Sequence, residues 1–164
     1  SARRYYDILI DTLVAHEIGP FTKSQKRRLV QHPRYYFFDV GVLNGAIDNF
    51  SVSGDRIGLL FEHLVLQLII SEAKARDETI RFSAYRTEAG AEVDFILEKK
   101  EAVFAIEVKA TKKVVSTDLR GLKSFIDFHG KRCHALMIYL GEQSLNIDGF
   151  DVLPVIEAMK FLGY

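Results

Sequence analysis

Length, composition and charge limit the classes of protein to which this chain can belong. Its 164 residues, 48% of them apolar, suffice for one well-packed domain with a small appendage but not for two full domains. The 22 basic and 22 acidic side chains cancel, so net charge alone favours neither a nucleic-acid nor a membrane partner. One cysteine excludes an internal disulfide, and the most apolar run, residues 57–70, is too short to span a bilayer. We expect a cytoplasmic protein without a membrane segment and, since the sequence starts at Ser1, a fragment.

The first third of the chain predicts an appendage with a basic connection. Apolar residues at helical spacing indicate a helix over residues 5–14, and two strands are expected within 16–38. The segment 44–56 is rich in Gly, Asn, Ser and Asp, which divides the chain into an appendage, residues 1–43, and a main domain, residues 44–164. The cations of this basic segment would either grip a phosphate backbone or form a solvated loop; they are Lys23, Lys26, Arg27, Arg28 and Arg34.

The main domain predicts a long, mostly buried helix with Asp55 as its N-cap, then three strands. A second helix capped by Ser116 or Thr117 and ended by Gly130 follows, then a strand and a closing helix after Pro154. The expected bounds of these elements are 55–76, 79–85, 92–97, 102–110, 116–130, 135–140 and 153–162. The order helix, three strands, helix, strand predicts an α/β fold.

The second and third strands predict a hairpin with an acidic face. If Lys99 and Lys100 form the turn, Asp94 lies opposite Ala105, with Glu107 one diagonal step away on the same face. Lys109 follows on that face by strand alternation. The opposite face is apolar and should rest on the core; its residues are Val93, Phe95, Leu97, Phe104, Ile106 and Val108.

Converging carboxylates in this pattern indicate a cation site. Asp94 and Glu107 would repel each other unless a cation or a proton is shared, and oxygen ligands suit Mg²⁺ or Mn²⁺. Such an ion polarises a phosphodiester and activates water, which a neighbouring Lys109 can orient. Glu62, in the otherwise apolar run of the long helix, needs a cation or a hydrogen-bond partner. Glu92 is either a supporting ligand or an exposed strand residue.

Two motifs carry a resemblance to a known superfamily. The first is Gly-Ala-Glu-Val-Asp-Phe at residues 90–95, and the second is Ile-Glu-Val-Lys-Ala at 106–110, preceded by a helix with Gly58 and Glu62. Together with the element order they resemble the PD-(D/E)XK nuclease superfamily. The resemblance implies a restriction-endonuclease-like αβββαβ core, with a mixed central sheet flanked by helices.

The resemblance also implies roles for individual residues. Asp94 and Glu107 would be metal ligands, Lys109 the catalytic lysine and Glu62 the helical acid that supports the metal. Glu-x-Lys after an Asp is common in exposed hairpins, so the motif alone is weak. Its combination with Glu62 and the element order favours the nuclease-like interpretation.

A wider pattern extends the resemblance over nearly the whole chain. Tyr-Tyr-Phe-Phe-Asp-Val-Gly at residues 35–41 and Tyr85-Arg86 resemble the uncharacterised domain C-terminal to prokaryotic AAA-type ATPases. This implies that residues 1–43 are the end of a winged-helix-like segment, and that an ATPase is a partner domain. No phosphate-binding loop of such an ATPase occurs in this sequence.

Two hypotheses about function follow. In the first, the domain hydrolyses DNA phosphodiester bonds with Mg²⁺ or Mn²⁺, and Arg86 joins the basic connection in holding phosphate. In the second, it is a catalytically inactive nucleic-acid-binding or protein-interaction module that regulates the ATPase. Metal binding discriminates the two hypotheses. Both are compatible with a monomer or an oligomer.

Overall fold

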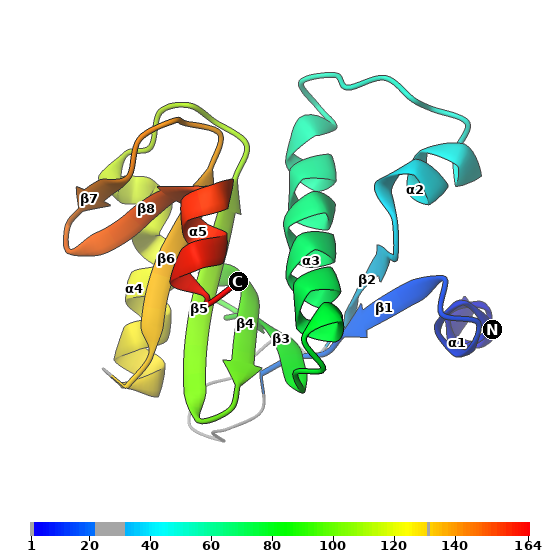
Figure 1. The fold of residues 1–164 in the computed structure, drawn as a ribbon, viewed down its shortest axis with the longest axis horizontal. Helices are drawn as coiled ribbons and strands as arrows, with labels where there is room; N and C mark the ends of the chain where they lie inside the picture. The colour runs from blue at the N-terminus through cyan, green and yellow to red at the C-terminus, as the bar shows by residue number, and fades with distance from the viewer. Residues whose placement is uncertain (1, 22–31, 131) are drawn as a thin grey trace.

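A computed structural model describes residues 2–21, 32–130 and 132–164 of the chain (Figure 1). The first elements are α1 (Ala2–Asp11), β1 (Ala15–Ile18), β2 (Arg34–Phe37) and α2 (Val40–Ala46). The sheet of the main domain contains β3 (Ile80–Arg86), β4 (Glu92–Lys99), β5 (Ala102–Lys109), β6 (His134–Tyr139), β7 (Leu145–Ile147) and β8 (Phe150–Pro154). Its helices are α3 (Ile57–Ala75), the short 3₁₀ turn η1 (Ser116–Leu119), α4 (Arg120–His129) and α5 (Val155–Phe161).

The main sheet has six strands in the order β3-β4-β5-β6-β8-β7. β3, β4 and β5 pair antiparallel, whereas β5, β6 and β8 pair parallel, and β7 adds an antiparallel edge. The chain therefore needs a crossover between β5 and β6, which η1 and α4 provide. The predicted α/β fold with a mixed sheet is confirmed.

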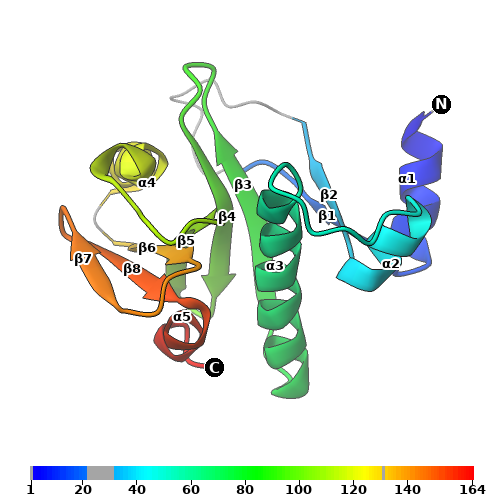
Figure 2. The same ribbon diagram turned by 90° about the horizontal axis from the view of Figure 1, so that it is seen from above.

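Helices cover both faces of this sheet (Figure 2). Phe61 and Val65 of α3 and Ala158 of α5 pack in one cluster of buried side chains, while Leu122 and Phe125 of α4 belong to a second. The expectation that one face of the β4-β5 hairpin is polar is wrong for most of its length. Ile96, Val103 and Ala105 on that face are buried against the α4 side, so the middle of the hairpin is apolar there. Strands buried on both faces carry apolar residues without alternation.

The hairpin turn also differs from the expected one. Lys100 and Glu101 form it, Lys99 pairs with Ala102, and Ile96 rather than Asp94 therefore lies opposite Ala105. Lys99 stays in the strand because its ammonium is buried, 2.7 Å from a Glu78 carboxylate oxygen and 3.1 Å from the Leu162 carbonyl oxygen. Lys100 adopts a positive φ of 54° in the turn.

Two predicted helix caps are wrong, and one helix and one hairpin were not predicted. α3 has Arg56 rather than Asp55 at its N-cap, and η1 has Val115 there, whose N–H donates to the Asp118 carboxylate (3.0 Å). The unpredicted elements are α2 and the β7-β8 hairpin. That hairpin turns on Asp148 and Gly149, both with positive φ, an Asp-Gly pair that is a strong two-residue hairpin signal.

The N-terminal elements join the main domain through a shared core. The two expected strands are present as β1 and β2, which pair antiparallel, and Ile18 and Tyr36 are buried in the same cluster as α3. Beyond β1 the chain runs along β3, where the Phe21 N–H donates to the Ala84 carbonyl at 2.9 Å. The division at residues 43 and 44 stays a prediction. None of the helices in the described ranges is both long and apolar enough to cross a membrane.

Candidate active site

A β-bulge in β4 positions the first acidic residue. Ser83 pairs with Ile96 and Tyr85 with Val93, so two residues of β4, Asp94 and Phe95, lie opposite the single residue between Ser83 and Tyr85. Val93 consequently packs toward α4 and Phe95 toward α3. The strict alternation on which the expected polar face depends therefore does not hold at Asp94.

The strands β4 and β5 separate at this level, and Asp94 fills the gap. Their ladder ends at Phe95 and Ile106, beyond which Oδ2 of Asp94 accepts the Val108 N–H at 2.9 Å. Oδ1 of Asp94 accepts from Nη1 of Arg34 at 3.2 Å. Burial raises the pKa of Asp94, while the bonds from Val108 and Arg34 oppose that rise. Asp94 is thus a buried carboxylate with both oxygens bonded.

Glu107 lies on β5 close to Asp94 and lacks such compensation. Its Oε2 atom is buried and accepts no hydrogen bond from any residue that the structure describes. Burial, followed by repulsion from Asp94 and Glu92, raises the pKa of Glu107 to about 9. A buried carboxyl of this kind must either hold a proton or receive a cation.

Lys109 follows two residues later on the same strand face, as expected. Its ammonium lies 2.9 Å from Oδ1 of Asp118 in η1, and its side chain is half exposed. The salt bridge holds the pKa of Asp118 below its usual range. Asp118 thereby connects the start of the crossover helix to the proposed catalytic lysine.

Glu62 faces the same cluster from α3. The Tyr36 hydroxyl donates to its Oε2 at 3.2 Å, which supplies the hydrogen-bond partner that the sequence required. Burial, reinforced by the charge of Asp94, raises the pKa of Glu62 to about 7. The structure therefore brings all three predicted acids close enough for their charges to act on one another.

Two of the six predicted phosphate-binding residues, Arg34 and Arg86, lie in the described part of the chain, and both contact an acid. Nη2 of Arg34 donates to Oε2 of Glu92 at 3.0 Å, and Nε of Arg86 lies 3.6 Å from that same oxygen. Both described arginines thus face acids in this structure, and their role toward DNA stays a prediction. The other four predicted cations lie outside the described residues; they are Lys23, Lys26, Arg27 and Arg28.

The acidic group is not gathered around a single point. Within residues 2–21, 32–130 and 132–164, no three His, Cys, Asp or Glu side chains lie close enough to hold a metal ion. The donor set nevertheless fits Mg²⁺ or Mn²⁺, because Asp94, Glu107 and Glu62 offer only carboxylate oxygens. A cation or a proton beside the unpartnered oxygen of Glu107 would offset the burial and repulsion that raise the pKa values of Glu107 and Glu62.

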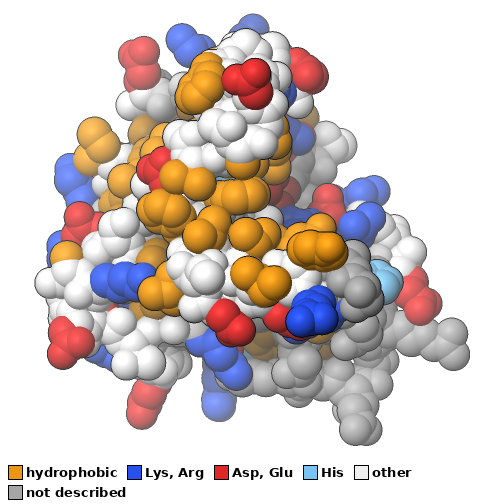
Figure 3. All heavy atoms as spheres, turned by 90° about the vertical axis from the view of Figure 1, so that its right-hand side faces the viewer, with side chains coloured by type: hydrophobic (Ala, Val, Ile, Leu, Met, Phe, Trp, Pro, Cys, Tyr) orange, Lys and Arg blue, Asp and Glu red, His pale blue; other side chains and the backbone are white. Residues whose placement is uncertain are grey.

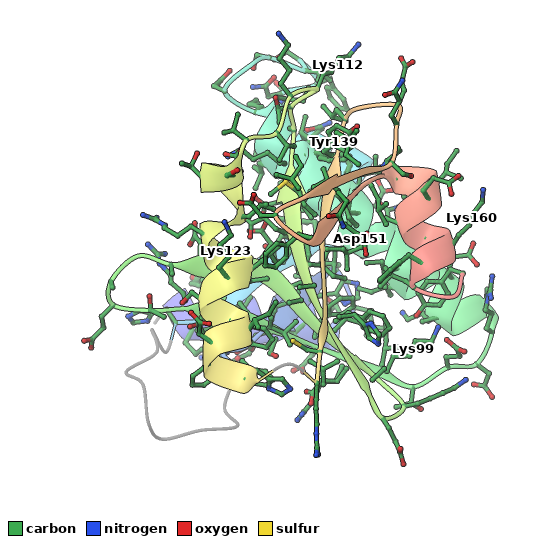
Figure 4. The ribbon with its side chains drawn as sticks, turned by 90° about the vertical axis from the view of Figure 1, so that its left-hand side faces the viewer. Lys99, Lys112, Lys123, Tyr139, Asp151 and Lys160 are labelled. Carbon is green, nitrogen blue, oxygen red and sulfur yellow. The ribbon has the colours of Figure 1, made fainter. Side chains whose placement is uncertain are left out.

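A cavity of about 520 Å³ adjoins the acids, and Glu107 and Lys109 line it. Arg120 and Lys123 also line it, and Figure 4 shows Lys123 projecting from α4. Gly121 lets α4 approach this closely, since a Cβ there would lie 1.7 Å from the Glu92 carbonyl oxygen. Neither cation is among the site residues expected from the sequence, although charges in the first turns of the helix after the Lys109 strand were a usable signal.

Comparisons with known proteins show which family the chain belongs to. Residues 57–158 match the model named "Domain of unknown function (DUF4143)", and residues 1–53 match "Domain of unknown function (DUF8612)". The chain is 28% identical over 115 residues to two uncharacterised proteins, Rv2008c of Mycobacterium tuberculosis and Mb2031c of Mycobacterium bovis. That match covers 68% of this chain but only 25% of each relative, so it spans a quarter of their length. Because the first model covers more than half of the 164 residues, the protein belongs to the DUF4143 family.

Proposed function

We propose that this protein contains a metal-dependent nuclease-like domain of the PD-(D/E)XK type, which hydrolyses DNA phosphodiester bonds. One observation carries the proposal. At the bulged end of β4, Asp94 lies beside Glu107, whose buried oxygen has no partner among the described residues, and Lys109 stands at the adjoining cavity. The order α3, β3, β4, β5, α4, β6 supports a restriction-endonuclease-like core.

Each residue of the site has a chemical task in this proposal. Asp94 and Glu107 would hold the cation, and Glu62, kept in place by Tyr36, would support it. Bound there, Mg²⁺ or Mn²⁺ would lower the pKa of water and withdraw charge from a phosphate. The Lys109 side chain, which contacts Asp118, can orient the attacking water or stabilise negative charge that develops on phosphate oxygens.

The adjoining cavity suggests where a nucleic-acid strand would lie. Lys109, Arg120 and Lys123 line it together with Glu107, so cations flank the proposed cation ligand. Each cation has a protein partner in the free structure: Arg120 donates to the Gly90 carbonyl (3.1 Å), and Lys123 pairs with Asp148 (2.7 Å). These exposed pairs are weak and can be exchanged for phosphate at little cost.

A plasmid-nicking assay tests the proposal. Wild type should convert supercoiled DNA to nicked or linear forms with Mg²⁺ or Mn²⁺ and not with excess chelator. Asp94→Ala and Lys109→Ala, purified identically, should abolish or strongly suppress the conversion. Equal cleavage by all three proteins would identify a contaminating nuclease and refute the assignment.

A second candidate function is supported by two observations. Both oxygens of Asp94 already have partners, as in a site that has become structural. In addition, Figure 3 shows apolar side chains gathered on the face around α1 and α2. The exposed apolar residues of these segments include Tyr5, Ile8, Leu13, Phe38 and Ile47. A catalytically inactive module that binds nucleic acid or docks on an attached AAA-type ATPase would use such a face.

The two candidates predict different behaviour of the same protein. A nuclease binds divalent cations at Asp94 and Glu107 and cleaves, whereas an inactive module retains DNA or protein binding when both acids are replaced. Binding of DNA by Asp94→Ala at wild-type affinity, without metal-dependent cleavage by wild type, would favour the module.

A further inference from the structure

Arg34 occupies an unusual place for a residue of the N-terminal hairpin. It belongs to β2, yet its guanidinium reaches the bulged end of β4, some 60 positions along the chain. We propose that Arg34 is a built-in cation of the acidic site, which must release Asp94 when a divalent cation binds and thereby sets the affinity of the site for that ion. This inference rests on the proposed function, because it concerns the same carboxylates.

The contacts of Arg34 show which oxygen atoms it would share with a divalent cation. One guanidinium nitrogen donates to Oδ1 of Asp94 at 3.2 Å, and the other donates to Oε2 of Glu92 at 3.0 Å. The Arg34 side chain is about three-quarters buried, at 26% exposure, and that of Asp94 is 8% exposed, so water screens the pair poorly. A cation that approaches the same oxygen of Asp94 meets the positive charge of this guanidinium at close range and competes with it.

Each oxygen of Asp94 already accepts one hydrogen bond. Its Oδ2 accepts the Val108 N–H at 2.9 Å, and this bond replaces the ladder where β4 and β5 separate. The oxygen facing Arg34 is therefore the one that a divalent ion can claim most readily. Glu107, by contrast, keeps a buried oxygen that has no hydrogen-bond partner among the described residues.

The N-terminal β1-β2 hairpin provides hydrogen-bond partners for two of the three acids. Arg34 and Tyr36 are alternate residues of β2, and strand geometry places their side chains on the same face. Arg34 bonds Asp94, and the Tyr36 hydroxyl bonds Glu62 at 3.2 Å. The acidic site is consequently composite, since these two residues fall in the segment 1–53 and the acids in the segment 57–158, each matched by a different family model.

This arrangement predicts opposite effects of Arg34 on the metal-free and metal-bound forms. Without an ion, the guanidinium offsets repulsion among buried carboxylates, so its loss should lower the thermal midpoint. With an ion, it is a competitor whose removal should favour binding. A charge-assisted hydrogen bond of ordinary strength corresponds to roughly a tenfold to hundredfold gain in Mn²⁺ affinity.

Calorimetric titration with Mn²⁺, paired with thermal unfolding of the same samples, tests the inference. Arg34→Gln should bind Mn²⁺ at least tenfold more tightly than wild type, unfold at a lower temperature without metal, and gain more from added metal. Arg34→Lys keeps the charge but loses the fork of two donors, so its Mn²⁺ affinity and unfolding temperature should change in the same directions by smaller amounts. Arg81→Gln, which removes a guanidinium paired with Glu98, should leave the affinity unchanged.

The outcomes separate this inference from the proposed function. Equal or weaker Mn²⁺ binding by both Arg34 variants, with wild type binding normally, would overturn the competition and leave the metal site standing. Binding by Arg34→Gln but not by wild type would support the competition and contradict metal-dependent catalysis by the unmodified protein. Absence of binding in all variants would overturn both. Should Arg34→Gln not fold, the milder Arg34→Lys decides in the same way.

Discussion

Replacing Glu107 by Gln should make the metal-free protein more stable at pH 8. A glutamine keeps the shape of the side chain and is neutral at every pH, so it needs no proton to avoid repulsion from Asp94 and Glu92. An amide can also remain neutral at a buried position where the carboxyl must hold a proton. Gain of stability on loss of a proposed catalytic residue is expected where function requires a destabilised site.

The size and the pH dependence of the gain follow from the pKa of Glu107. In the unfolded chain this carboxyl ionises near 4.5, whereas burial raises its pKa to about 9 in the folded protein. Between these values the folded state keeps a proton that the unfolded state has released, so stability falls by about 1.4 kcal/mol per pH unit as pH rises. At pH 8 the cost reaches on the order of 5 kcal/mol. Burying the glutamine amide costs about 1–3 kcal/mol, so a net gain of about 2 kcal/mol or more remains.

Thermal unfolding at pH 5 and pH 8, with and without Mn²⁺, measures this effect. A gain of about 2 kcal/mol corresponds to a rise in Tm of roughly 4–8 °C at pH 8, and the rise should vanish at pH 5. Mn²⁺ should stabilise wild type and not Glu107→Gln. The control is Glu101→Gln, in the exposed turn of the same hairpin. It should change neither the Tm at pH 8 nor the stabilisation by Mn²⁺. A Tm of Glu107→Gln at or below that of wild type at pH 8 would refute the reasoning.

Three further predictions concern the surroundings of the acids. Gly121→Ala should destabilise the protein by about 1–3 kcal/mol, because its Cβ would strike the Glu92 carbonyl oxygen; an unchanged urea midpoint would show that α4 can shift freely. Lys109→Ala should keep Mn²⁺ affinity near that of wild type while suppressing cleavage, with Lys109→Arg only partly active, and loss of Mn²⁺ binding would instead make Lys109 part of the metal site. Replacing Arg120 and Lys123 by Ala should each reduce the slope of log affinity for duplex DNA against log salt by about 0.9, and unchanged slopes in an anisotropy titration would remove the α4 cavity from the interface.

The order of the main elements could be predicted because local signals define each one. The long apolar run of α3, the three strands after it and the glycine that ends α4 are all visible in the sequence. Gly130 indeed has a positive φ of 93° at that end. The sequence thus predicts a mixed α/β arrangement in which Glu107 and Lys109 share a strand.

The details of the site could not be predicted because they depend on distant contacts. The hairpin register is shifted from the expected one, since Lys99 is drawn into the strand by Glu78 and Leu162, neither of which is adjacent in sequence. The bulge at Asp94 breaks an alternation that local patterns cannot reveal. Arg34 resembled one more cation of a basic segment, and only the folded chain brings it to a buried carboxylate.

Counting bound Mn²⁺ tests the central claim most directly, because the nuclease proposal and its alternative differ first in whether the acids hold a divalent ion. Free aqueous Mn²⁺ gives a strong paramagnetic resonance signal that largely disappears on binding to protein. Wild type should remove this signal in proportion to its concentration, and the double variant Asp94→Ala, Glu107→Ala should leave it intact. Equal loss of signal with both proteins, or no loss with either, would contradict a metal site at the bulged end of β4.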